Sequence, residues 1–313
     1  MTYRPLGRTN LQISRVSLGA GGPSRLGLSQ NGPAQVDRLI KQAIDLGINL
    51  IDTARGYGTE EAIGAALQSV REPIHIATKV WCYPTDDVSD PHQPPLTDPH
   101  HLVTSVEQSL KALRRDRLDI LQLHGVPGPG LAPMIEHFLP AMLGLRQEGK
   151  IRHIGTTEHP GIDPLQDMAA AACKADLFDT LMIQYGIFDQ EARRRTFSLA
   201  QKHNVGILCM CAARGALTDA ATLQHMLSRI EPEGKPSLEF LLKGPVRSYA
   251  DAAFRFAAAR DEIHTVVVGT GQVDHLIEST AAVLGDPLPT AHLDALEQRF
   301  GHLDGQHLWP EYD

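Results

Sequence analysis

Four polar side chains with complementary chemistry occur in the first half of the chain. They are Asp52 in LIDTA, Tyr57 in GYG, Lys79 in ATKV and His124 in LQLHG. A phenol within hydrogen-bond reach of a developing alkoxide can give it a proton. An ammonium about 4 Å from the phenol would favour the phenolate by on the order of 4 kcal/mol. That exceeds the roughly 2.7 kcal/mol that corresponds to lowering the pKa of the phenol by about two units.

The other two groups would support such a proton donor. A lysine in a partly desolvated position tends to lose its proton, and a nearby carboxylate such as Asp52 opposes this loss. His124 could orient a substrate carbonyl, either as a neutral donor or as a partner in proton transfer. Taken singly, each residue also fits a structural explanation, such as a turn former or a core histidine. Their joint position therefore decides whether they form a site.

Short apolar runs alternate eight times with longer segments of helical period, from RVSLG and AQVDRLIKQAIDLG to HTVVVGTG and QVDHLIESTAAVLG. Several runs are continuously apolar, because both faces of a strand in a covered parallel sheet are buried. Eight such units predict a (β/α)8 TIM barrel, with residues 1–313 as a single domain. The four polar residues lie at or just after the ends of the second, third and fourth predicted strands. We therefore expect them on one face of the barrel.

An open doubly wound sheet is the alternative fold, and it would carry G-x-G-x-x-G after its first strand. The sequence there is GAGGPS, with Ser24 in place of the third glycine. GTGQVD after the last strand departs in the same way. These glycines suit tight turns or close approach of the backbone to a ligand instead.

Segments outside the repeating pattern have predicted places in the barrel. The N-terminal TYRPLGRTNLQISR predicts a hairpin that closes the end opposite the catalytic face. Residues 82–100 and 214–248 follow the third and seventh strands, and 285–313 follows the last helix. Connections this long are usually functional or disordered. The first two leave strand C-termini, so we expect them to build a substrate pocket.

The composition excludes several classes of protein. Lys and Arg number 29 against 37 Asp and Glu, and the net charge of −8 argues against nucleic-acid binding as the function. The 42% hydrophobic and 21% charged residues are typical of a globular protein. Four scattered cysteines predict a reducing compartment, and no signal or membrane segment is evident. We expect a cytoplasmic protein with no membrane partner and with a homo-oligomer left open.

Motifs for other chemistries are missing from the sequence. The 15 histidines include no H-E-x-x-H, so no metal site is expected. Cys209 and Cys211 lack the C-x-x-C spacing of a redox pair and are expected in the core. Neither G-x-S-x-G nor G-x-x-x-x-G-K-[ST] occurs, which removes the basis for hydrolase and phosphoryl-transfer hypotheses.

Longer stretches of the chain resemble the aldo-keto reductase family. They include GINLIDTARGYGTEEAIGAAL, IHIATKVW, SLKALRRDRLDILQLHG, GKIRHIGTTEH and VVVGTGQVDHLIES, and the resemblance covers roughly residues 3 to 285. It implies that Asp52, Tyr57, Lys79 and His124 form a catalytic tetrad. It also implies hydride transfer between a nicotinamide cofactor, NADP or NAD, and a small carbonyl or alcohol.

The resemblance also implies the cofactor contacts. Residues 269–271 would approach the adenosine, Glu278 the adenine, and residues 211–217 the pyrophosphate. The full set of implied contacts is Gly21, Thr157, Glu158, Gln184, Met210, Cys211, Ala213, Gly215, Leu217, Gly269, Thr270, Gly271, His275, Glu278 and Ser279.

Several of these positions depart from the family pattern. The usual Ser-Asn pair that holds the nicotinamide amide reads Thr157-Glu158, and the usual glutamine reads Met182, although Gln184 shares its strand face. Met210 replaces an aromatic that stacks on the nicotinamide. The basic pair for the 2′-phosphate aligns with Gly269 and His275. Without these two positive charges on the 2′-phosphate, we expect a relaxed cofactor preference or use of NADH.

The main functional hypothesis is an NAD(P)-dependent oxidoreductase for small aldehydes, ketones or the corresponding alcohols. Trp81, Cys82, Phe188 and Trp309 are predicted walls of the substrate pocket, although ordinary hydrophobic packing explains each equally well. Sugars, aliphatic aldehydes and aromatic aldehydes all stay open as substrates. One alternative is a regulatory or sensor subunit that binds nicotinamide with little turnover. A barrel lyase or isomerase without redox chemistry is another.

Overall fold

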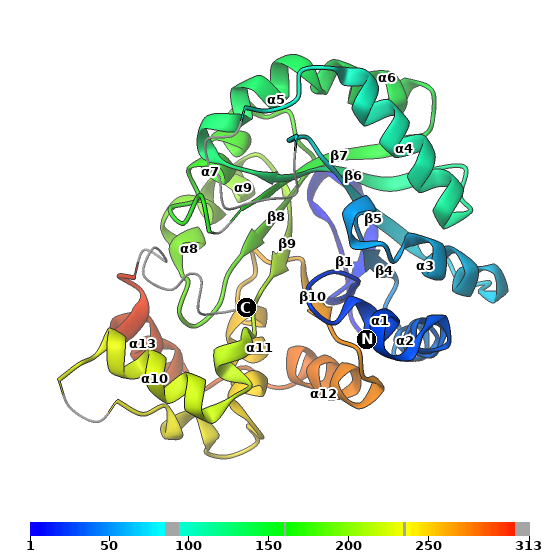
Figure 1. The fold of residues 1–313 in the computed structure, drawn as a ribbon. Helices are drawn as coiled ribbons and strands as arrows, with labels where there is room; N and C mark the ends of the chain where they lie inside the picture. Colours follow the sequence, from blue (N-terminus) through cyan, green and yellow to red (C-terminus); the bar gives the residue numbers. More distant parts are fainter. Residues whose placement is uncertain (85–93, 160, 234–235, 304–313) are drawn as a thin grey trace.

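The computed structural model describes residues 1–84, 94–159, 161–233 and 236–303. Eight parallel strands form a closed barrel in the order β10-β3-β4-β5-β6-β7-β8-β9 (Figure 1). This confirms the predicted (β/α)8 fold. The barrel strands are β3 (Val16–Gly19), β4 (Leu50–Asp52), β5 (His75–Trp81), β6 (Leu118–Val126), β7 (Ile151–Glu158), β8 (Thr180–Gln184), β9 (Gly206–Met210) and β10 (Thr265–Gly269).

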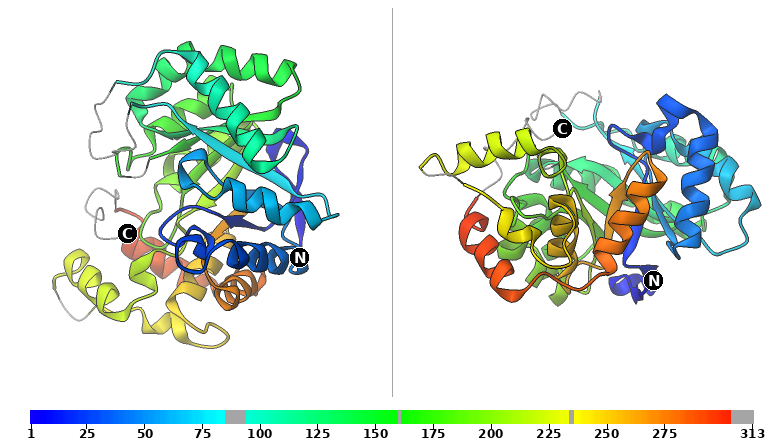
Figure 2. Two further views of the ribbon diagram at one scale, coloured as in Figure 1. Left: turned by 45° about the vertical axis from the view of Figure 1, so that its right-hand side comes forward. Right: turned by 90° about the horizontal axis from the view of Figure 1, so that it is seen from below.

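Helices surround the barrel and cover the outer faces of its strands (Figures 1 and 2). They are α1 (Leu28–Asn31), α2 (Pro33–Asp45), α3 (Glu60–Ala66), α4 (Pro99–Leu113), α5 (Leu131–His137), α6 (Leu139–Gln147), α7 (Asp167–Ala175), α8 (Glu191–Arg195), α9 (Phe197–Lys202), α10 (Ala220–Ile230), α11 (Tyr249–Ala258), α12 (Val273–Leu284) and α13 (Thr290–Phe300).

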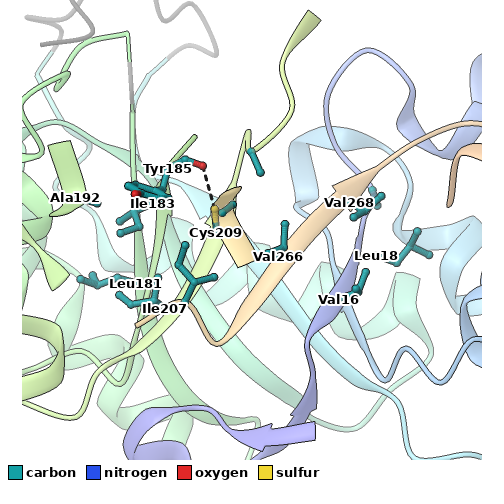
Figure 3. Close-up of a cluster of buried hydrophobic side chains, with 14 of the residues drawn as sticks. Val16, Leu18, Leu181, Ile183, Tyr185, Ala192, Ile207, Cys209, Val266 and Val268 are labelled. Carbon is teal, nitrogen blue, oxygen red and sulfur yellow. Dashed lines mark hydrogen bonds between the residues drawn. The ribbon is translucent and has the colours of Figure 1, made fainter. Parts of the chain in front are cut away.

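The largest hydrophobic core lies between the helices and the outside of the barrel. Figure 3 shows part of it, where Val16 and Leu18 of β3, Ile207 of β9 and Val266 and Val268 of β10 contribute buried side chains. These β-branched and leucine side chains stand on pleated strands that are covered by helices, which explains their continuous apolar runs. The register pairs Asp52 with Ala77, Lys79 with Gln122 and Trp81 with His124, so the polar strand ends reach one edge together.

The N-terminal segment closes the other end of the barrel, as predicted. Strands β1 (Tyr3–Pro5) and β2 (Gln12–Ser14) pair antiparallel and frame a short turn. Leu6, Leu11 and Ile13 pack into a second core with residues that face into the barrel, which are Leu50, Ala77, Ile120, Met182 and Leu208. The right-hand view of Figure 2 shows the hairpin at the lower end of the barrel and α10 near the upper end.

Two segments that the sequence indicated as long connections contain helices. Asp219 caps α10 by accepting from the Thr222 backbone N–H at 2.7 Å, and Leu223, Met226 and Leu227 bury its apolar face. The tail after Gly285 contains α13, and Arg299 joins it to Glu231 at 2.7 Å. The capping aspartate and the spacing of the apolar residues were signals for α10. Proline and charge around them favoured the loop interpretation.

No helix in the described ranges is both long and apolar enough to cross a membrane. Part of the connection at 82–100 lies outside those ranges, and so does Trp309, one of the predicted pocket walls.

Leu6→Ala should lower the free energy of unfolding by about 2–5 kcal/mol, because it leaves a cavity where the hairpin meets the barrel interior. Leu6 has no exposed surface. The matched control is Leu177→Ala at a side chain that is 43% exposed, for which we expect less than about 1 kcal/mol. Chemical denaturation measures both. Equal losses of unfolding free energy in the two variants would contradict a stabilising contact between the hairpin and the barrel interior.

Candidate active site

The four predicted catalytic side chains lie together at the C-terminal edge of the barrel. Lys79 of β5 donates to Oδ2 of Asp52, the last residue of β4, at 2.6 Å and to the Thr53 carbonyl at 2.8 Å. Its Nζ atom lies 5.1 Å from the centre of the Tyr57 ring. The Tyr57 hydroxyl is 3.2 Å from Nε2 of His124 on β6. Asp52 and Lys79 are buried, whereas Tyr57 and His124 are partly exposed and can meet a ligand.

A short turn after β4 places the tyrosine. The 3₁₀ turn Arg55–Tyr57 ends at Gly58, whose φ of +71° reverses the chain into α3. The hydroxyls of Thr53 and Thr59 lie 3.0 Å apart and join the two ends of this turn. A Cβ atom at Gly21 would come within 2.5 Å of the Tyr57 ring, so Gly21 lets β3 and its following loop approach the phenol closely.

Opposite charges stabilise each other beneath the phenol. Burial disfavours the Lys79 ammonium, but Asp52 and Tyr57 together more than offset this effect and raise the pKa of Lys79 above its ordinary value. Gln122 adds a hydrogen bond to Oδ1 of Asp52 at 3.5 Å. The site therefore places the positive charge of Lys79 below the Tyr57 ring.

Tyr57 and His124 are both neutral in this arrangement. Burial raises the pKa of the Tyr57 hydroxyl, and the Lys79 charge opposes this rise without reversing it. Burial also holds the pKa of His124 well below its usual value, with further lowering from Lys79 and His159. The expectation that Lys79 lowers the pKa of the phenol by about two units is therefore wrong for the ligand-free protein, because desolvation exceeds the attraction of the ammonium.

Predicted pocket walls lie in different places. Trp81 packs edge-on against His124 with ring centres 5.4 Å apart, so it borders the site. Cys82 is buried in the outer core, with Sγ 3.6 Å from the Val80 carbonyl, and it does not reach the site. Phe188 packs against Phe300 at 4.9 Å and lines a separate small pocket below the segment that follows β9.

The predicted adenosine contacts border a surface hollow between α2 and the loop after β10. Gly269, Thr270, Gly271 and His275 line it together with Ser24, Gln35 and Arg38. Gln35 donates to the Gly271 carbonyl at 2.8 Å and holds the loop against α2. Glu278 and Ser279 lie further along α12, where Glu278 is exposed. A polar hollow that is lined by a guanidinium and by glycine backbone fits a nucleotide.

The predicted nicotinamide contacts are buried more deeply. Thr157 accepts from the Gly125 N–H at 2.7 Å. Oε1 of Glu158 accepts from the backbone N–H of Gln184, whereas Oε2 is buried and has no hydrogen-bond partner among the described residues. Burial and the nearby Asp189 raise the pKa of Glu158 well above its usual value. Met210 ends β9 and pairs in register with Gln184.

The predicted pyrophosphate contacts directly follow β9. Cys211 has a left-handed φ of +57° and turns the chain across the barrel mouth. Leu217 is buried, Ala213 is partly exposed and Gly215 is exposed at the start of a single 3₁₀ turn.

Two residues in this region were not singled out from the sequence. Arg214 donates to Oε1 of Gln184, whose Nε2 donates to Oδ2 of Asp189. Both the oxygen and the nitrogen of the Gln184 side-chain amide therefore already have hydrogen-bond partners within the protein. Asp189 follows a bend in which Gly186 and Asp189 form an isolated bridge. An aspartate shortly after a strand was the only sequence signal for Asp189. Arg214 lay within residues 211–217, which the resemblance assigned to the pyrophosphate, but it was not named individually.

Metal chemistry has no visible site in the described part of the chain. No group of three or more His, Cys, Asp or Glu side chains there is arranged to hold a metal ion.

Comparisons with known proteins agree with this architecture. The chain is 28% identical to the Bacillus subtilis oxidoreductase YqkF over 95% of this chain and 96% of that protein. It is 30% identical to L-galactose dehydrogenase of Arabidopsis thaliana, covering 90% and 87% of the two chains. The holo form of aldo-keto reductase AKR11C1 from Bacillus halodurans superposes with a TM-score of 0.74 at 26% identity, covering 96% of each chain. Residues 15–299 match the family model of the aldo/keto reductases, and the chain belongs to that family.

Proposed function

We propose that this protein is an NAD(P)-dependent oxidoreductase that interconverts small aldehydes or ketones with the corresponding alcohols. The observation that carries the proposal is the partly exposed Tyr57 hydroxyl, 3.2 Å from His124 and above the buried Lys79–Asp52 pair. The arrangement provides a proton donor, an orienting group and a fixed charge at one point. The oxidoreductase names of the related proteins support the same conclusion.

Tyr57 is the proton donor for the carbonyl oxygen in this proposal. The bound nicotinamide supplies the hydride, and the protein supplies the proton and the geometry. His124 is neutral and positions the carbonyl oxygen beside the phenol. When Tyr57 gives up its proton, the Lys79 ammonium stabilises the phenolate, and Asp52 keeps that ammonium charged. In alcohol oxidation the same charge would favour the phenolate that accepts the proton.

The residues at the barrel mouth fit a dinucleotide that spans it. The hollow at Gly269–His275 would hold the adenosine end, and the segment after β9 would follow the pyrophosphate. Thr157, Glu158 and Gln184 would surround the nicotinamide amide. Arg38 of α2 adds a guanidinium to the hollow, on a different element from the basic pair that the family uses.

Tyr57→Phe should reduce the turnover number for carbonyl reduction by about 10²–10⁴-fold, since it removes the proton donor and little else. Nicotinamide binding, followed by fluorescence titration, should be unchanged. Tyr3→Phe is the matched control, because Tyr3 lies at the surface with its hydroxyl on the Gly47 carbonyl. Retention of more than about a tenth of the turnover in Tyr57→Phe would exclude this role. Cofactor binding without turnover in the wild type would favour a sensor subunit.

The turnover number for reduction at saturating cofactor should be independent of pH between about 6 and 8. The raised pKa keeps Tyr57 protonated throughout that range, and the lowered pKa keeps His124 neutral. A loss of activity is expected only as the pH approaches or exceeds the ordinary pKa of a phenol, about 10. A pH profile with a limb near 6.5 would show that His124 titrates and would contradict the assignment.

Cofactor preference should be relaxed, because Arg38 faces the hollow without the usual basic pair. The ratio of kcat/KM for NADPH to that for NADH should stay below about a hundredfold, or roughly 2.7 kcal/mol. Arg38→Ala should impair NADPH more than NADH. Lys41→Ala on the same helix, where Lys41 pairs with Asp37 at 2.8 Å, should affect neither. A stronger NADPH preference, or equal effects of Arg38→Ala on both cofactors, would contradict this prediction.

A further inference from the structure

The backbone of the turn that carries Tyr57 is sparsely packed. Glycines flank the phenol at Gly56 and Gly58, and apart from the adjacent residues no described atom lies within 4 Å of the position that a Cβ would take at either glycine. The outer side of the turn borders a surface hollow that Arg55 and Gly58 line. Glycine leaves the backbone conformationally free. Contacts of the neighbouring side chains therefore decide where the phenol lies.

Glu60 is a buried carboxylate directly after this turn. It begins α3 and is 1% exposed. Its Oε1 atom accepts a hydrogen bond from the Thr78 hydroxyl on β5 at 2.8 Å. Its Oε2 atom has no hydrogen-bond partner among the described residues and lies 3.6 Å from Nη1 of Arg55. The carboxylate thus connects the strand that carries Lys79 with the turn that carries Tyr57.

The hydrogen bond to Thr78 attaches α3 to β5 next to the residue that bears the ammonium. Successive side chains of a strand point to opposite faces. Lys79 enters the barrel mouth and contacts Asp52, whereas Thr78 has no exposed surface and contacts α3 on the outer face. Movement of α3 along β5 would therefore change the position of Tyr57 relative to Lys79.

Arg55 makes a second and weaker contact at the start of the turn. Its side chain is 43% exposed, and its Nε atom also donates to Oε1 of Gln108 on α4 at 3.4 Å. Exposed ion pairs contribute little to stability. The buried hydrogen bond between Thr78 and Glu60 is therefore the main contact that holds the turn to β5.

A carboxylate at this position needs an explanation other than stability. Burial disfavours its charge, and well-packed apolar side chains in place of a buried ion pair often give equal or greater stability. A hydrogen bond has a narrow range of distance and angle, so it fixes the separation of the two elements that it joins. The contacts of Glu60 therefore indicate a role in placing the turn.

We propose that Glu60 is a positioning residue for proton transfer. Its bond to Thr78 keeps the Tyr57 hydroxyl beside His124. A misplacement of reacting groups by about 1 Å can reduce a rate on the order of 10²-fold. The inference rests on the proposed role of Tyr57 as proton donor. Glu60 itself lies outside the barrel mouth and acts only through the position of the phenol.

Variants of Glu60 test the proposal with a small aldehyde that the wild type reduces. Glu60→Ala should lower the turnover number about 10- to 100-fold. Glu60→Gln retains an oxygen for the Thr78 hydroxyl and should recover most of this loss. Nicotinamide affinity, measured by fluorescence titration, should stay unchanged in both. Glu61→Ala is the matched control, because Glu61 is the exposed neighbour on α3, and it should alter neither quantity.

Variants of Thr78 separate the hydrogen bond from packing. Thr78→Val keeps the volume of the buried side chain but removes the donor, and it should lower the turnover number. Thr78→Ser keeps the hydroxyl and should retain turnover within about threefold of the wild type. A role in packing alone predicts the reverse order, because the serine leaves a small cavity and the valine does not.

The Tyr57→Phe background separates positioning of the phenol from a general loss of structure. Without the hydroxyl, its position no longer affects proton transfer. Glu60→Ala should then lower the residual turnover of Tyr57→Phe by less than about threefold, because the two changes act on one interaction. A general loss of structure would reduce both backgrounds by the same factor.

Each result decides between the alternatives. Full turnover in Glu60→Ala, a larger loss in Thr78→Ser than in Thr78→Val, or an undiminished effect in the Tyr57→Phe background overturns the inference and leaves the proposed function intact. If Glu60→Ala does not fold, or if Tyr57→Phe is too slow to measure, the two Thr78 variants decide. Absence of carbonyl reduction by the wild type overturns the proposed function together with the inference.

Discussion

The buried contact between Lys79 and Asp52 is the interaction on which the candidate site depends. Both side chains are buried, with Nζ of Lys79 2.6 Å from Oδ2 of Asp52. Burial raises the pKa of Asp52, and the Lys79 ammonium opposes this rise. Removing one member of such a pair typically costs about 3–5 kcal/mol, because the other is left buried and uncompensated. The pair also sets the electrostatic environment of Tyr57. The stability of the fold and the proposed chemistry therefore both require Lys79 and Asp52 to stay paired.

This ion pair changes the expected role of the phenol. An ammonium near a tyrosine suggests an acidified hydroxyl, yet burial keeps Tyr57 protonated in the ligand-free protein. A protonated phenol beside a neutral imidazole is ready to give a proton to a carbonyl oxygen. In the proposed mechanism, the ammonium becomes most important as the proton leaves and the phenol takes on negative charge. An interaction lowers a barrier when it is stronger in the transition state than in the starting state, and negative charge that develops on the phenol during the transfer would meet this condition.

The barrel supplies a second charged centre at the opposite side of its mouth. Glu158, Asp189 and Arg214 come from the ends of three successive strands or the segments after them, as the tetrad comes from three others. The tetrad balances its charges internally through Lys79 and Asp52. The second group contains two buried carboxyl groups near one guanidinium.

Local sequence determined the strand and helix alternation, the hairpin and the succession of Asp52, Tyr57, Lys79 and His124, because periodicity and strand ends are properties of neighbouring residues. The same reasoning missed α10 and α13, since proline and charge obscured short amphipathic patterns. It also placed Cys82 at a pocket wall, whereas Cys82 is buried in the outer core with Val80, two residues before it. The prediction of a lowered pKa for Tyr57 was wrong for another reason. The extent of desolvation depends on every element that packs around the ring. Only the tertiary structure joined Arg214 to Gln184 and Asp189, since no spacing along the chain reveals contacts between side chains at the ends of different strands.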